Sequence, residues 1–147
     1  MTTSRAAIRN AVANLLEAGL GLPAGNVLRA LPGKFYGMTP AVLVLSSGSG
    51  REPSGYGIEQ PVFLLDIKTY VLLGKADDAT WDSGDTEAQL DAIEAQIAGI
   101  LEANATKHGL WTNAQYNGRS KVEDVMSIDG FIYRRESIPV RVECSNE

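Results

Sequence analysis

The sequence predicts an α+β domain in which a mostly antiparallel β-sheet carries two amphipathic α-helices packed on one face. Three observations lead to this prediction. Two segments, near residues 4–19 and 86–104, repeat apolar residues at the spacing of a helix. Shorter apolar or alternating runs, with the length of strands, follow each of them. The chain has 147 residues, the size of one ordinary domain, so residues 1–147 are expected to form a single domain.

The first helix is expected to begin after Ser4, whose hydroxyl can accept a hydrogen bond from a free N–H group of the first turn. Gly19 and Gly21 should end this helix, and Pro23 prevents it from starting again. Residues 26–31 are then expected to form a short strand. The apolar stripe of the helix comprises Ile8, Val12, Leu15 and Leu16.

Two strands are expected next, at residues 41–45 and 62–73. The first is a fully apolar run, whereas the second alternates and places Asp66, Lys68 and Tyr70 on its polar side. The stretch between them is rich in Gly, Ser and Pro, which predicts a flexible loop over residues 46–60.

A polar connection leads to the second helix, which is expected to begin with a capping box formed by Thr86 and Gln89. Three carboxylates recur on one stripe of this helix. They are Glu87, Asp91 and Glu94, while Leu90, Ile93, Ile97, Ile100 and Leu101 form the apolar stripe.

The last third of the chain predicts strands. A strand at 110–116 precedes a turn, and a hairpin joins 121–128 to 131–136. The final strand, at 138–143, alternates cleanly, and Pro139 should keep it at or near an edge of the sheet because proline lacks an N–H donor. Residues 144–147 are expected to be a C-terminal tail, although the alternation would turn Cys144 inward.

Composition excludes several classes of function. The net charge of −5 argues against a free-standing nucleic-acid-binding protein, because phosphate contacts need clustered Lys and Arg. One cysteine and one histidine exclude an intrachain disulfide, a Cys-based zinc site and every two-histidine metal motif. No apolar run approaches the ~20 residues that span a bilayer, and no signal sequence is recognisable. We therefore expect a protein made in the cytoplasm, without membrane contact.

No motif predicts catalysis, a cofactor or a metal. The glycine-rich stretch at 48–57 lacks the GK[ST] ending of a phosphate-binding loop. The aspartates between residues 77 and 85 do not match the spacing of a calcium loop. His108 follows the second helix, where a cation interacts well with the helix C-terminus. We therefore expect no enzyme, no catalytic residue, no cofactor and no metal ion.

The order of the elements resembles that of the tail terminator proteins of long-tailed bacteriophages, the lambda minor tail protein U-like group. The resemblance begins with SRAAIRNAVANLL at residues 4–16 and continues through the strand at 41–45, the polar loop, the strand at 62–73 and the helix at 86–104. It ends with the strand at 138–143, so it covers most of the chain as a layout of elements.

The resemblance implies a structural protein of the virion, assembled in the host cytoplasm and placed at the neck end of the tail. Such a protein caps the tail tube as a homohexameric ring, ends tube polymerisation and offers a joining surface to the neck or head–tail connector. Its expected partners are copies of itself, the tail tube protein and the neck protein. An exposed edge at 138–143 could supply one ring contact, and the loop at 46–57 could order on contact with the tail tube.

Residue types indicate which side chains would contact partners, because Arg, Tyr and Trp are favoured in interfaces. The candidates are Arg51, Tyr56, Trp81, Arg134 and Arg141. The acidity is concentrated, since residues 75–105 hold eight carboxylates and one lysine. Asp91 and Glu94 are therefore candidates for facing the lumen of a ring, where they would repel DNA.

Two other functions fit the sequence. One is a head–tail connector, neck or tail-completion adaptor protein. The other is a small ligand-binding domain or enzyme with a pocket under the loop at 46–57.

Overall fold

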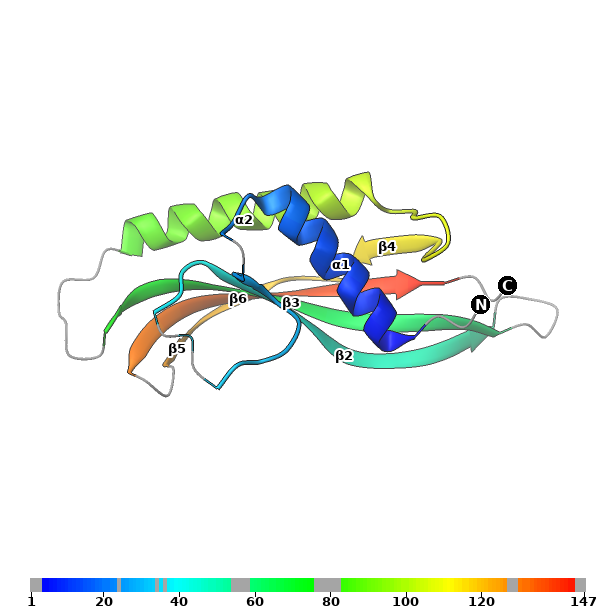
Figure 1. Ribbon diagram of the computed structural model, residues 1–147, viewed down its shortest axis with the longest axis horizontal. Helices are drawn as coiled ribbons and strands as arrows, with labels where there is room; N and C mark the ends of the chain where they lie inside the picture. The colour runs from blue at the N-terminus through cyan, green and yellow to red at the C-terminus, as the bar shows by residue number, and fades with distance from the viewer. Residues whose placement is uncertain are drawn as a thin grey trace.

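The computed structural model describes residues 4–23, 25–33, 35, 37–53, 59–75, 83–126 and 130–144. Two helices and six strands occur in these residues (Figure 1). In chain order they are α1 (Arg5–Leu20), β1 (Val27–Leu28), β2 (Ala41–Pro53), β3 (Glu59–Lys75), α2 (Ser83–Ala103), β4 (Asn113–Tyr116), β5 (Lys121–Met126) and β6 (Phe131–Glu143). The protein is therefore α+β, as the sequence predicted.

The strands form one mixed six-stranded sheet in the order β1-β2-β3-β6-β4, and β5 also pairs with β6. Only β1 runs parallel to its neighbour, β2, so the sheet is mostly antiparallel. The long strands β2, β3 and β6 form its centre. The short strands β4 and β5 share one side of β6, where β4 pairs near Glu143 and β5 pairs near Phe131.

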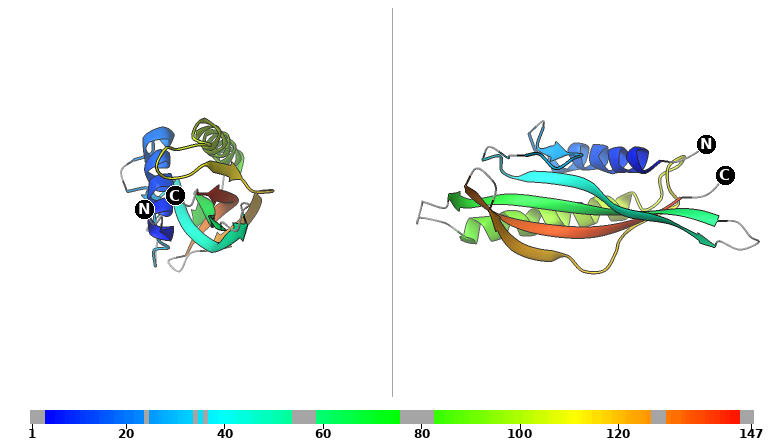
Figure 2. Two further views of the ribbon diagram at one scale, coloured as in Figure 1. Left: turned by 90° about the vertical axis from the view of Figure 1, so that its right-hand side faces the viewer. Right: turned by 90° about the horizontal axis from the view of Figure 1, so that it is seen from below.

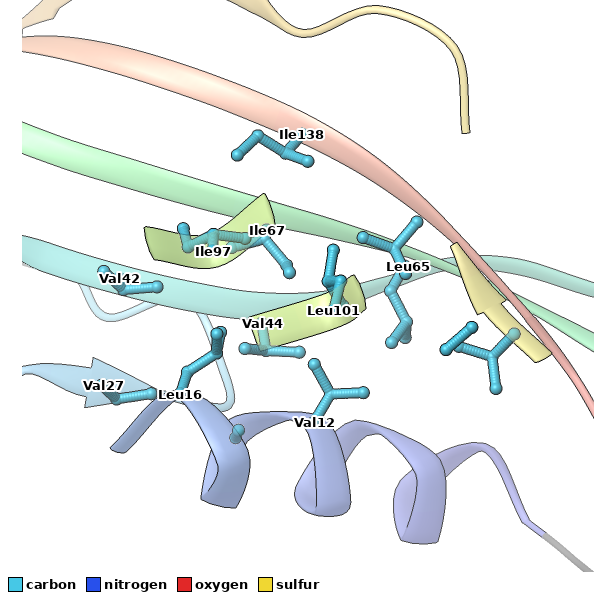
Figure 3. Close-up of a cluster of buried hydrophobic side chains, with 14 of the residues drawn as sticks. Val12, Leu16, Val27, Val42, Val44, Leu65, Ile67, Ile97, Leu101 and Ile138 are labelled. Carbon is cyan, nitrogen blue, oxygen red and sulfur yellow. The ribbon is translucent and has the colours of Figure 1, made fainter. Parts of the chain in front are cut away.

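The main hydrophobic core joins both helices to one face of the sheet. Ile8, Val12 and Leu16 of α1 belong to the same buried cluster as Ile97 and Leu101 of α2. Strand residues complete the cluster, among them Val42, Val44, Leu65, Ile67 and Ile138 (Figure 3). Val140 and Val142 of β6 also belong to it. The helical and alternating spacings of the sequence therefore converge on one interior.

A smaller cluster lies on the opposite face of the sheet, because its strand residues alternate with those of the main core. Phe35 contacts Tyr70 and Tyr133 there, with ring centroids 4.6 and 5.3 Å apart. Ala41 and Leu43 complete this cluster. Partly buried hydrophobic residues, among them Leu45, Leu72 and Val125, pack around it. We call this face, which neither described helix covers, the uncovered face.

Both ends of α1 follow from the local sequence, whereas the start of α2 depends on contacts with distant residues. The Ser4 hydroxyl accepts a hydrogen bond from the N–H of Ala7 at 3.1 Å, and Gly21 ends α1 with φ 67°. The capping box predicted at Thr86 was wrong, because α2 already begins at Ser83. Thr86 is buried, and its hydroxyl donates instead to the carbonyl of Leu72 at 3.3 Å.

The flexible loop predicted at 46–60 was wrong for most of its length. Strand β2 continues to Pro53 and β3 starts at Glu59, with continuous pairing between them apart from an irregularity between Ser46 and Gly48. Pairing with β3 satisfies the backbone groups of this polar stretch, so the segment needs no apolar side chains to remain extended. Residues 54–58 lie outside the described part of the chain.

The closing strand is neither separate nor at an edge, which corrects two predictions. The runs at 131–136 and 138–143 form the single strand β6, which pairs with β3 on one side and with β4 and β5 on the other. Pro139 is tolerated because it lies opposite the gap between β4 and β5. Its carbonyl accepts from the N–H of Asn117 at 2.8 Å, so the missing donor also faces this gap.

The chain beyond β6 continues the core at Cys144, so the predicted tail at 144–147 was wrong for this residue. Cys144 is 1% exposed, and its N–H donates to the carbonyl of Pro61 at 3.0 Å. Burial raises the pKa of its thiol to about 11, which makes the thiolate scarce at neutral pH. Residues 145–147 lie outside the described part of the chain. Neither described helix is both long and apolar enough to cross a membrane.

Candidate interaction surfaces

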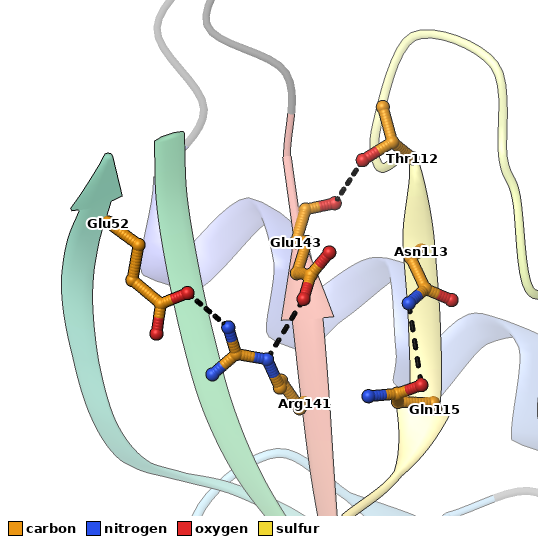
Figure 4. Close-up of polar contacts among 6 residues, drawn as sticks. All are labelled: Glu52, Thr112, Asn113, Gln115, Arg141 and Glu143. Atoms are coloured by element: carbon orange, nitrogen blue, oxygen red, sulfur yellow. Dashed lines mark hydrogen bonds and ion pairs between the residues drawn. The ribbon is translucent and has the colours of Figure 1, made fainter. Parts of the chain in front are cut away.

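The uncovered face carries a polar group around Arg141, one of the residues predicted to contact partners (Figure 4). Its guanidinium forms an ion pair with Glu52 of β2, and its Nε donates to Oε1 of Glu143 at 3.0 Å. Hydrogen bonds with these two carboxylates raise the pKa of Arg141. Arg141 thus reaches from β6 across β3 to β2, and its charge is balanced within the chain.

The neighbouring strand β4 is attached at the same end of this face. The Thr112 backbone N–H and hydroxyl both donate to the carbonyl of Glu143, at 2.9 and 3.1 Å. The side chain of Asn113 donates to Gln115 at 3.4 Å, and Gln115 is exposed (Figure 4). This end of the uncovered face offers amide and carboxylate groups at the surface.

Arg134, a second predicted contact residue, links three elements on the helix side of the sheet. It forms ion pairs with Glu87 of α2 and with Asp124 of β5, the latter at 3.0 Å. On the other face Arg135 pairs with Glu123 and lies 5.8 Å from the centroid of the Tyr70 ring. These ion pairs attach β5 to β6 from both faces.

We call the surface formed by α2 and β5 the acidic side. It carries Glu87, Asp91 and Glu94 on α2, Asp124 on β5 and the almost buried Glu136 on β6. Among the described residues, the ion pairs of these five carboxylates all involve Arg134. The predicted lumen residues therefore belong to this surface, where Asp91 is exposed and Glu94 is half-buried.

Glu136 is the unusual member of the acidic side. It is 7% exposed, and the hydroxyl of Ser120 donates to its Oε2 at 2.7 Å. Burial raises the pKa of Glu136, and the carboxylates of Glu94, Asp91 and Glu87 add to this increase. Sequence reasoning missed this residue, because a Glu inside an alternating strand gives no signal of what covers it.

We call the surface formed by α1 and β2 the basic side. Arg5 donates to the hydroxyl of Ser49 at 2.6 Å, and Arg9 donates to the hydroxyl of Ser46 at 3.0 Å. The predicted contact residue Arg51 is exposed in the same stretch of β2. Within the described part of the chain, no carboxylate lies within ion-pair distance of these three arginines.

The structure gives different results for Tyr56, for the two tryptophans and for the single histidine. Tyr56 and Trp81 lie outside the described residues. Trp111 is 3% exposed, and its indole N–H donates to the carbonyl of Asn104 at 2.8 Å, so it packs in the core as its residue type predicts. His108 is exposed in the turn after α2. In the described residues no three His, Cys, Asp or Glu side chains gather in a way that could hold a metal ion.

Comparison with known proteins finds a likeness to solved structures. No protein-family model and no curated protein matches the chain. A chain of the structure described as "Virion of native gene transfer agent (GTA) particle" is similar, with 18% sequence identity and a TM-score of 0.51. The likeness covers 92% of this chain and 94% of that chain, so the two share their fold over nearly their whole lengths.

Proposed function

We propose that this protein is a structural component of a phage-like virion, and that it caps the tail tube as a homohexameric ring. The observation that carries the proposal is the fold shared with a chain of a virion particle over 92% of this chain. The order of elements in the sequence supports the same assignment independently, because it resembles that of tail terminator proteins. In this role the protein ends tube polymerisation, offers a joining surface to the neck, and catalyses no reaction.

The surfaces of the chain are compatible with a ring. A closed ring of identical copies needs two different patches on each subunit, one for each neighbour. The acidic side and the basic side are two such patches, and they differ in charge. The uncovered face leaves a third surface for the tail tube or the neck.

Size-exclusion chromatography with light scattering tests the ring directly. We expect a particle about six times the 15.7 kDa mass of the chain. A mass of 15.7 kDa at every concentration would contradict a preformed ring. Cross-linking with mass spectrometry on the purified ring would then show whether each subunit contacts its neighbours through two different patches.

A head–tail connector or neck adaptor is the second candidate, because the likeness to a chain of a virion particle indicates no position within the particle. The two candidates differ in the surface they occupy. A terminator should bind purified tail tubes and stop their elongation, whereas a connector should bind finished tails or heads without affecting tube length.

A further inference from the structure

The strands of the two charged sides, β2 and β5, lie on opposite long sides of the sheet, while α1 and α2 pack against each other over one face. In the strand order, β2 and β5 are separated by β3 and β6, so the outer sides of β2 and β5 face away from each other. The view from below shows this plainly, with α1 and β1 along one long side of the sheet and β5 along the other (Figure 2). A neighbouring molecule could therefore contact each side without competing for the other.

Within the described residues, the basic side holds positive charge that no carboxylate pairs. Arg5 and Arg9 donate to serine hydroxyls there, and Arg51 is exposed in the same part of β2. The other arginines of the sheet, by contrast, are ion-paired. Three such cations on one side favour a partner that brings carboxylates.

The acidic side combines negative charge with an open strand edge. Along the described residues, β5 pairs with β6 alone, so the backbone groups of its outer edge have no strand beside them. Val122 and Met126 point to the same side of β5 and are 42% and 64% exposed. The charged residues Glu123 and Asp124 of β5 are paired with arginines of β6, so Lys121 at the start of the strand is its remaining charge, and the edge near Met126 carries no unpaired charge of β5.

The location of the two sides and their opposite charges together indicate which molecule would cover the edge of β5. We infer that the acidic side of one copy, formed by α2 and β5, docks against the basic side of the next copy, formed by α1 and β2. This inference rests on the proposed ring and names the contact that would close it. The contact is head-to-tail, as a ring requires, because the two patches differ.

The expected contact has a polar and an apolar component. Asp91 and Glu94 face the arginines of the neighbour, where opposite charges steer association and fix its orientation. Val122 and Met126 lose their exposed apolar surface to the neighbour, which favours association at any salt concentration. The carboxylates of α2 therefore acquire a role between subunits in place of the expected role in the lumen.

Charge reversal in three variants tests this contact. The first is Arg5→Glu with Arg51→Glu, the second is Asp91→Lys with Glu94→Lys, and the third carries all four substitutions. Arg5 begins α1, where a glutamate suits the helix N-terminus, so the first variant should remain folded. Gln115→Glu and Gln115→Lys change the charge of the exposed uncovered face and serve as controls.

We expect each double variant to lose about tenfold or more in association constant, because like charges meet at the contact. The fourfold variant should recover most of that loss, and both controls should assemble as the unchanged protein does. Light scattering gives the mass, and circular dichroism confirms that every variant is folded. If the unchanged chain forms a ring and the double variants do as well, the docking mode is wrong while the ring stands. If the unchanged chain is a monomer throughout, both the ring and this contact fail.

Discussion

At the scale of single residues, Glu136 is a carboxylate that the fold covers and that no cation pairs within the described residues. The hydroxyl of Ser120 donates to it, and its charged neighbours on α2 are themselves acidic. Burial and these neighbours raise the pKa of Glu136 above its ordinary value of 4.5, so ionisation is easier in the unfolded chain than in the folded one. The ionised carboxylate therefore destabilises the fold, and this cost grows as pH rises through the folded pKa.

Glu136→Gln should consequently stabilise the protein at neutral pH. The amide keeps an oxygen that can accept from Ser120 and removes the buried charge. We expect a higher Tm at pH 7, by about 2–4 °C for each kcal/mol gained. The difference from the unchanged protein should shrink as pH falls to 4.5 and below, since Glu136 then becomes protonated in both states. Scanning calorimetry at several pH values measures it, with the exposed Glu59→Gln as the control, and a lower Tm at pH 7 would contradict the argument.

At the scale of elements, the sequence predicts most of the helices and strands but not which strands lie side by side in the sheet. Both helices and the strands at 41–45 and 62–73 are found where their apolar spacing places them. Strand β6 differs, because the sequence alone treats Pro139 as a mark of an edge. Its central position depends on a gap between β4 and β5. Both strands lie on the same side of β6 and pair with different parts of it, which the sequence around Pro139 does not indicate.

The polar part of β2 illustrates the same limit. Glycine and serine normally favour loops. Residues 48–53 form a strand because they pair with β3, and the register of this pairing cannot be predicted from the residues of the stretch itself. The candidate contact residues show the same limit of what the sequence predicts. Arg51, Arg134 and Arg141 could be chosen by residue type, but which of them are already ion-paired depends on contacts between separate strands.

The open edge of β5 yields a prediction at this scale. Met126→Lys replaces a side chain that is 64% exposed, so the free energy of unfolding of a single subunit should change by less than about 0.5 kcal/mol. Association should weaken, because the exposed apolar surface of β5 is lost from the proposed contact. Chemical denaturation at low concentration and light scattering at high concentration separate the two effects. Gln115→Lys adds the same charge on the uncovered face, and equal loss of assembly in both variants would count against β5.

At the scale of the whole molecule, charge is distributed unevenly over a chain whose net charge is only −5. The ion pairs of β6 neutralise its three arginines. Within the described residues, Arg5, Arg9 and Arg51 on one long side and Asp91 and Glu94 on the other form no ion pair. The positive charge lies beside α1 and β2, and the negative charge lies beside α2 and β5. Such a molecule is attracted to its own copies in one orientation and repelled in others, so the same charges that limit random association favour an ordered chain of contacts.

Salt should therefore act on assembly in a characteristic way. Screening shortens the range of charge interactions from about 10 Å at 0.1 M salt to about 3 Å at 1 M. If the acidic and basic sides supply the contact, raising NaCl over this range should shift the particle toward smaller masses and slow its association. Sedimentation velocity at several salt concentrations measures the masses, and stopped-flow light scattering measures the rate. The fourfold charge-swapped variant should show the same salt dependence, because it keeps opposite charges across the contact. A ring that becomes more stable as salt increases would instead be held by apolar surface, and the arginines of α1 and β2 would then have no part in closing it.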